Sequence, residues 1–133
     1  MKLKKIAALA LSAVMMCAVT FPAYAEWHVT ADGSTAYYSY DDTGVIAINN
    51  WVRDYDGTWT AVDSEGWVIR DEWIHSHDDY WYYVNEYGSM LSGADYYIPY
   101  RGRYYDMQLN RYVYDSVPAD TYHFMSDGHY EYR

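Results

Sequence analysis

Glycine and tryptophan recur at a fixed interval in the middle of the chain. Gly44, Gly66 and Gly88 are 22 residues apart, and Trp51 and Trp73 each lie seven residues after one of these glycines. Equal spacing over successive segments is the signature of a repeat architecture, in which one supersecondary unit is copied and stacked on its neighbours. The chain is therefore expected to fold as an array of similar units of about 22 residues.

The same spacing extends, with fewer matching residues, toward both ends. The next position of the glycine series is Asn110, and asparagine is enriched among the non-glycine residues that adopt positive φ. A shortened copy, "YHFMSDGHYEYR", closes the chain. The predicted repeat domain is residues 26–133. Its units are approximately 27–44, 45–66, 67–88, 89–110 and a partial copy over 111–133.

Each unit alternates polar turns with short aromatic runs. The segment "RDYDGT" before Trp59 and the segment "HSHDDY" before Trp81 are typical of hairpin turns. Runs such as "WYYV" from Trp81 are rich in strand-favouring aromatics and too short for helices. Because one two-stranded hairpin is marginal in water, the aromatic faces must be buried by stacking hairpin on hairpin. The predicted fold class is therefore all-β, built of stacked β-hairpin repeats.

The N-terminal segment, residues 1–25, has the pattern of a secretory signal peptide. Three lysines are followed by an apolar run from Ile6 to Phe21 and by the small-residue cleavage pattern Ala23-Tyr24-Ala25. The apolar run is shorter than the roughly 20 residues that a spanning helix needs. We expect a signal peptide helix that is cleaved, a mature chain that begins at Glu26 without a transmembrane segment, and secretion to the cell surface or cell wall.

Removal of this segment leaves a strongly acidic chain without cysteine. The sequence holds 9 Lys and Arg against 19 Asp and Glu, and all three lysines lie in residues 1–25, so the mature chain keeps 6 − 19 = −13 formal charges. This charge argues against a nucleic-acid partner, whose phosphates would be repelled. Without disulfides, a small secreted domain must find its stability elsewhere, and its many Tyr and Trp side chains are the evident source.

The quoted motifs resemble a known family. "GWVIRDEW" from Gly66, "WYYVNEYGSMLSG" from Trp81 and the 22-residue step are similar to the cell-wall-binding, or choline-binding, repeats of Gram-positive surface proteins. The resemblance implies that consecutive hairpins stack as a left-handed β-solenoid. It also implies that rings of neighbouring hairpins form shallow cages for the choline of teichoic acids, and related repeats bind glucans. The fourth unit departs from the pattern, with Asp95 and Arg103 at its two leading positions.

A cage of aromatic rings suits a quaternary ammonium group, which cannot donate a conventional hydrogen bond but is attracted to ring faces. Tyr82 and Tyr104 alternate with their neighbours and are expected to be buried. The candidate ring walls occupy matched places in the best-preserved units. They are Trp51, Trp59, Trp73, Trp81 and Tyr83.

Two alternatives to a choline-bearing polymer stay open. Flat aromatic side chains also stack on sugar rings, which would make the chain a glucan-binding or other polysaccharide-binding module. The aromatics would instead only stack on each other or on a partner if the array were a structural or adhesive surface protein without a small ligand. The residues do not indicate an oligomeric state.

Catalytic and metal-binding interpretations are weaker than structural ones. His75 and His77 precede Asp78 and Asp79 in a predicted hairpin turn, where polar side chains are expected in any case. The paired carboxylates elsewhere also fall at repeated turn positions, and no nucleophile stands in a recognisable setting. The sequence predicts no enzyme activity, no cofactor and no metal.

Overall fold

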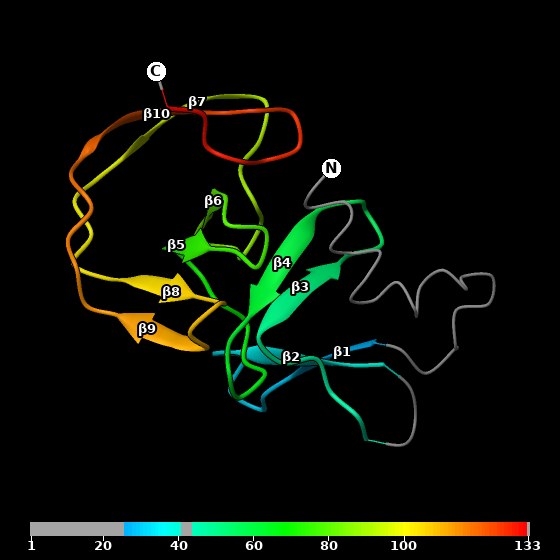
Figure 1. The fold of residues 1–133 in the computed structure, drawn as a ribbon. Coiled ribbons are helices and arrows are strands. Elements are labelled where there is room, and N and C mark those ends of the chain that lie inside the picture. The colour runs from blue at the N-terminus through cyan, green and yellow to red at the C-terminus, as the bar shows by residue number, and fades with distance from the viewer. Residues whose placement is uncertain (1–25, 41–43, 133) are drawn as a thin grey trace. The chain divides into compact units, whose positions relative to one another are not determined.

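The computed structural model of the chain describes residues 26–40 and 44–132 (Figure 1). The predicted signal peptide, residues 1–25, lies outside the described residues. Within the described ranges the regular secondary structure consists of ten β-strands, and no helix there is long and apolar enough to cross a membrane. The predicted all-β class is confirmed.

The chain divides into two compact units at Val68 and Ile69. The first unit contains two antiparallel hairpins. The segment after the second hairpin returns to the first, because the Val68 N–H donates to the carbonyl of Ala36 at 2.9 Å. The strands pair β1 with β2 and β3 with β4. They are β1 (Glu26–Val29), β2 (Ala36–Ser39), β3 (Asn50–Arg53) and β4 (Trp59–Val62).

The second unit begins with a hairpin of the same design. β5 (Glu72–His75) and β6 (Trp81–Val84) pair antiparallel through a turn in which Asp79 adopts a φ of 72°. The corresponding turn of the first unit has Gly57 at a φ of 88°. An aspartate therefore takes the left-handed position that glycine usually occupies, which short polar side chains tolerate. The remaining strands are β7 (Ala94–Ile98), β8 (Tyr104–Asp106), β9 (Arg111–Val113) and β10 (Asp120–Phe124).

The fourth hairpin differs from the simple 22-residue unit, because β7 pairs with β10 and not with β8. Its antiparallel pairing continues from Ala94↔Phe124 through the bridge Arg101↔Val117 to the β8–β9 pair at the tip, where the register has shifted by one residue. Figure 1 shows this long hairpin from β7, in yellow, to β10, in orange, with β8 and β9 at its far end. We call residues 99–119 the extension.

The backbone hydrogen bonds show where the repeat resumes after the extension. The N–H of Asp71 donates to the carbonyl of Asn85, and one unit later the N–H of Gly93 donates to the carbonyl of Met125, both at 2.9 Å. The positive-φ glycine after β6 is Gly88, and its counterpart after β10 is Gly128. The interval between these two glycines is therefore 40 residues, whereas the interval in a regular unit is 22. The fourth hairpin is thus 18 residues longer than a regular one.

Asn110 has the predicted backbone conformation at a different place in the fold. Its φ is 58°, as expected from its position in the glycine series. It lies between Asp106 and Arg111, which pair at the tip of the β8–β9 hairpin. The turn equivalent to those of Gly66 and Gly88 is formed by Gly128 instead.

The extension is attached to β5. β8 runs parallel to β5, with Ile74 opposite Tyr105 and His75 opposite Asp106. Beside this pairing, the Arg103 guanidinium lies 2.6 Å from a carboxylate oxygen of Glu72. Burial raises the pKa of the Glu72 carboxyl, and the hydrogen bond and charge of Arg103 partly offset this rise.

Replacing Arg103 by Met should therefore lower the free energy of unfolding by about 1–3 kcal/mol, because a buried carboxylate loses its charged partner. The loss should be larger at pH 7 than at pH 5. A carboxyl whose pKa is raised in the folded state is destabilising above its ordinary pKa and harmless once protonated. Urea unfolding at the two pH values measures both effects. The exposed Arg111, replaced by Met, is the control, and equal losses in the two variants would contradict this account.

Candidate aromatic binding pocket

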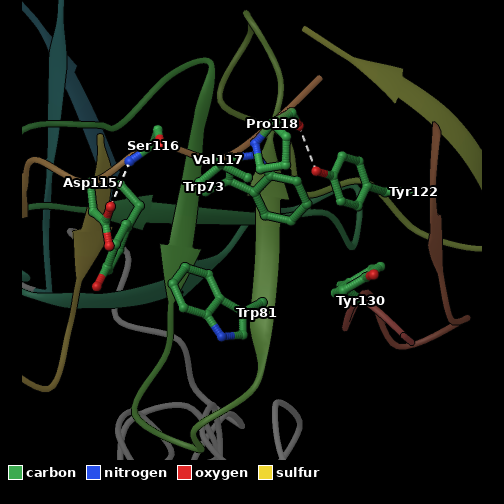
Figure 2. A pocket seen from close by; sticks show the side chains of 9 residues that line it. Trp73, Trp81, Asp115, Ser116, Val117, Pro118, Tyr122 and Tyr130 are labelled. Carbon is green, nitrogen blue, oxygen red and sulfur yellow. Dashed lines mark hydrogen bonds between the residues drawn. The ribbon is translucent and has the colours of Figure 1, made fainter. Parts of the chain in front are cut away.

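A pocket of about 300 Å³ lies within the second unit (Figure 2). Five aromatic rings line it, from β5, β6, β8, β10 and the segment that follows β10. A short stretch of the extension completes the lining. The residues are Trp73, Trp81, Tyr104, Asp115, Ser116, Val117, Pro118, Tyr122 and Tyr130.

The rings of the pocket meet mostly edge to face. The Trp73 and Tyr122 centroids are 4.8 Å apart at an interplanar angle of 75°, and Trp81 and Tyr104 are 4.7 Å apart at 68°. The Tyr130 ring lies next to the Tyr122 ring, and their centroids are 5.2 Å apart. Rings that meet at steep angles enclose a concave surface, whereas parallel rings would form a solid stack. The arrangement suits a compact ligand that touches several rings at once.

Strand alternation explains why Trp73 and Trp81 share a face. Trp73 and His75 are two residues apart on β5, and their partners across the hairpin are Tyr83 and Trp81. All four side chains therefore point to the same side of the hairpin. The His75 ring stacks on Trp81 at 4.8 Å and 28°. Its two nitrogens lie 3.1 Å from Asp106 and 2.7 Å from Asp79. These contacts fix the orientation of Trp81.

The pocket lining carries one carboxylate. Burial raises the pKa of Tyr104, Tyr122 and Tyr130 above the ordinary tyrosine value, so these phenols are neutral at pH 7. Asp115 is the acidic residue among those that line the pocket. One of its carboxylate oxygens accepts a hydrogen bond from the Ser116 N–H at 2.9 Å, drawn as a dashed line in Figure 2. A neutral aromatic lining with one negative charge is chemically suited to a cation with apolar substituents.

Solved structures with the same fold include a multimodular pneumococcal cell wall endolysin from phage Cp-1, complexed with choline. The identity is 18% and the TM-score 0.50, with 84% of this chain and 26% of the endolysin covered, so the chain spans about a quarter of that protein. The chain has the choline-binding repeat fold.

Two further solved structures resemble the chain less closely in geometry. The choline binding domain of Spr1274 in Streptococcus pneumoniae has 27% identity and a TM-score of 0.41, over 50% of this chain and 81% of that domain. Alternansucrase in complex with isomaltotriose has 21% identity and a TM-score of 0.42, over 80% of this chain and 10% of the enzyme. No protein-family model and no curated protein sequence matches the chain.

Within this choline-binding repeat fold, the five candidate ring walls occupy different environments. Trp51 and Trp59, in the first unit, are 0% and 7% exposed. Trp73 and Tyr83 belong to the core cluster of the second unit, and their centroids are 5.4 Å apart. Trp81 is half-buried. The structure brings Trp73 and Trp81 together in the pocket, where Trp81 is the more accessible ring. A ligand role for the five residues stays a prediction.

Several residues of the pocket were not among the sequence candidates. Tyr122 and Tyr130 lie in the shortened copy at the end of the chain, and Tyr104 was expected to be buried. The structure leaves Tyr104 half-buried at the pocket. The sequence feature that could have pointed to Tyr122 and Tyr130 is the Asp-Gly pair at 127–128, which marks the turn after β10. Counted back from this turn, Tyr122 takes the place in β10 that Tyr82 has in β6.

Proposed function

We propose that the protein is a secreted, non-catalytic module that binds a cell-wall glycopolymer, with choline-bearing teichoic acid or a related polysaccharide as its partner. Residues 1–25 act as the signal peptide in this proposal, and residues 26–133 form the repeat domain. The observation that carries it is the ring-lined pocket with a single carboxylate in the second unit. The fold shared with an endolysin that was solved with choline supports the same ligand.

The physical chemistry of the pocket sets the expected affinity. Each cation–π contact contributes about 0.5–2 kcal/mol. A few such contacts, less the cost of association, correspond to a dissociation constant on the order of millimolar. One such site holds a ligand weakly, but a polymer that presents many cations can raise the effective affinity by about 10²–10⁴ when several sites are engaged at once. Tight attachment is therefore proposed to depend on a repetitive ligand.

A titration with three small molecules tests this proposal. Choline should perturb tryptophan fluorescence saturably in the millimolar range, as expected for a few cation–π contacts. Its neutral isostere 3,3-dimethylbutan-1-ol, which has the same shape without the charge, should bind more weakly, and isomaltotriose should have no saturable effect. Saturation by isomaltotriose alone would identify a glucan-binding module. No response to any of the three would favour a structural or adhesive role.

The variant that links the response to the pocket is Trp81→Ala. We expect it to weaken choline binding at least about tenfold, because a half-buried ring of the lining is lost. Trp67→Ala is the matched control. It removes a half-buried tryptophan of the first unit, whose ring contacts Tyr37 edge to face at 5.8 Å. Equal weakening by both variants would place the site elsewhere.

A further inference from the structure

We infer that the extension, residues 99–119, makes the pocket select cationic over neutral ligands of the same shape, through the carboxylate of Asp115. This inference rests on the proposed function, since it concerns the ligand of the same pocket. It adds a specificity determinant that belongs to this chain's lengthened fourth hairpin and not to the regular 22-residue unit.

The extension supplies one side of the pocket. Trp73, Trp81, Tyr122 and Tyr130 come from the regular parts of the third and fourth hairpins, whereas Tyr104 and residues 115–118 come from the extension. In a fourth hairpin of ordinary length this side would be missing. The pocket would then be an open groove of neutral rings, without a charged group in its lining.

Hydrogen bonds hold this side of the pocket in place. Val117 and Arg101 exchange two backbone bonds of 2.7 and 3.0 Å across the extension. The Arg101 guanidinium lies 2.7 Å from a carboxylate oxygen of Asp71, the residue immediately before β5. A second contact comes from β10, where the Tyr122 hydroxyl donates to the Pro118 carbonyl at 2.5 Å, as Figure 2 shows. The segment that carries Asp115 is therefore anchored both to the third hairpin and to β10.

The carboxylate changes what the pocket can distinguish. Aromatic rings attract a quaternary ammonium, but they also bind a neutral group of the same shape through apolar contact. A fixed negative charge adds an attraction for the cation alone. Asp115 is exposed, so solvent screens this attraction to the strength of a surface ion pair, and salt weakens it further. The rings are thus responsible for most of the affinity, while the carboxylate sets the preference for charge.

The test compares two ligands on two variants by following the indole N–H resonance of Trp81 in NMR titrations. Asp115→Asn keeps the oxygen that accepts the Ser116 N–H and removes only the charge. It should weaken choline binding by roughly two- to fivefold, and this loss should shrink at high salt. Binding of 3,3-dimethylbutan-1-ol should be unchanged. Glu86→Gln, which removes an exposed carboxylate of the same unit outside the pocket lining, should leave both affinities unchanged.

The outcomes separate this inference from the proposed function. If the unsubstituted protein binds neither ligand, choline-bearing teichoic acid is ruled out as the partner in the proposed function, and the inference falls with it. If choline binds but Asp115→Asn weakens both ligands equally, or weakens choline no more than Glu86→Gln does, the inference is overturned while the proposed function stands. A loss of affinity that is seen only for choline, and only in the Asp115→Asn variant, supports the inference.

Discussion

Replacing Trp73 by Ala is expected to lower the free energy of unfolding by about 3–5 kcal/mol, the usual loss when a large buried aromatic is truncated. The Trp73 side chain is 2% exposed. Its ring contacts Tyr83, Tyr122, Phe124 and Tyr130 with centroid distances of 4.8 to 6.0 Å. Trp73, Tyr83, Tyr122 and Phe124 form a core cluster together with Ile98, and the neighbouring β-strands cannot collapse into a void of that size.

Urea unfolding followed by circular dichroism measures this loss. The matched control is Tyr97→Ala, which removes a ring from β7 that is 68% exposed and should change the stability by less than about 0.5 kcal/mol. A small loss for Trp73→Ala would mean that its ring is not a core element. In that case its role at the pocket would have to be reconsidered, because the pocket wall depends on its fixed position.

The second large effect is a loss of stability at alkaline pH. The hydroxyls of Tyr82 and Tyr83 donate to the carboxylates of Asp78 and Asp71 at 2.6 and 2.5 Å. Burial, together with these carboxylates, raises the pKa of both phenols well above the ordinary value of 10.0. The unfolded chain therefore loses these two protons at a lower pH than the folded chain does. Stability should be fully present below pH 10 and should fall steadily as the pH rises above it.

Two measurements check this expectation. The urea midpoint should decrease above pH 10, and phenolate absorbance should show two tyrosines that ionise only when the protein unfolds. Tyr82→Phe should lower the stability at neutral pH, because Asp78 loses a hydrogen-bond partner, and should make the alkaline decline less steep. Ionisation of every tyrosine near pH 10 without unfolding would contradict the burial of these two phenols.

The 22-residue spacing predicted the all-β class correctly because it reflects local structure. β3, β5 and β7 begin at Asn50, Glu72 and Ala94, each one residue after a position with positive φ. Turn residues and strand-favouring aromatics influence the backbone conformation of only a few neighbouring positions, so their preferences can be inferred directly from the sequence. The sequence likewise indicated Trp73 and Trp81 as candidate ring walls of one unit, whereas their shared face follows from the register of β5 and β6.

The strand pairing of the fourth hairpin does not follow from the 22-residue spacing. Asn110 continues the 22-residue series and has a positive φ, yet the hairpin partner of β7 lies beyond it, in β10. Both β8 and β10 are candidate partners for β7. The pairing that forms depends on which of these two strands buries its aromatic rings against β7. Tyr122 and Phe124 of β10 pack into the core cluster with Ile98 of β7. Local propensity does not contain that information.

The sequence by itself determined the repeating hairpins, their turns and the aromatic composition of their faces, because these follow from the conformational preferences of each residue and its near neighbours. Only the tertiary structure decided which rings are core and which are accessible, and that the extension brings Tyr104 and Asp115 to Trp81. Contacts between residues far apart in the chain depend on how well the side chains of alternative pairings fit together, and this packing is decided only when the whole unit folds.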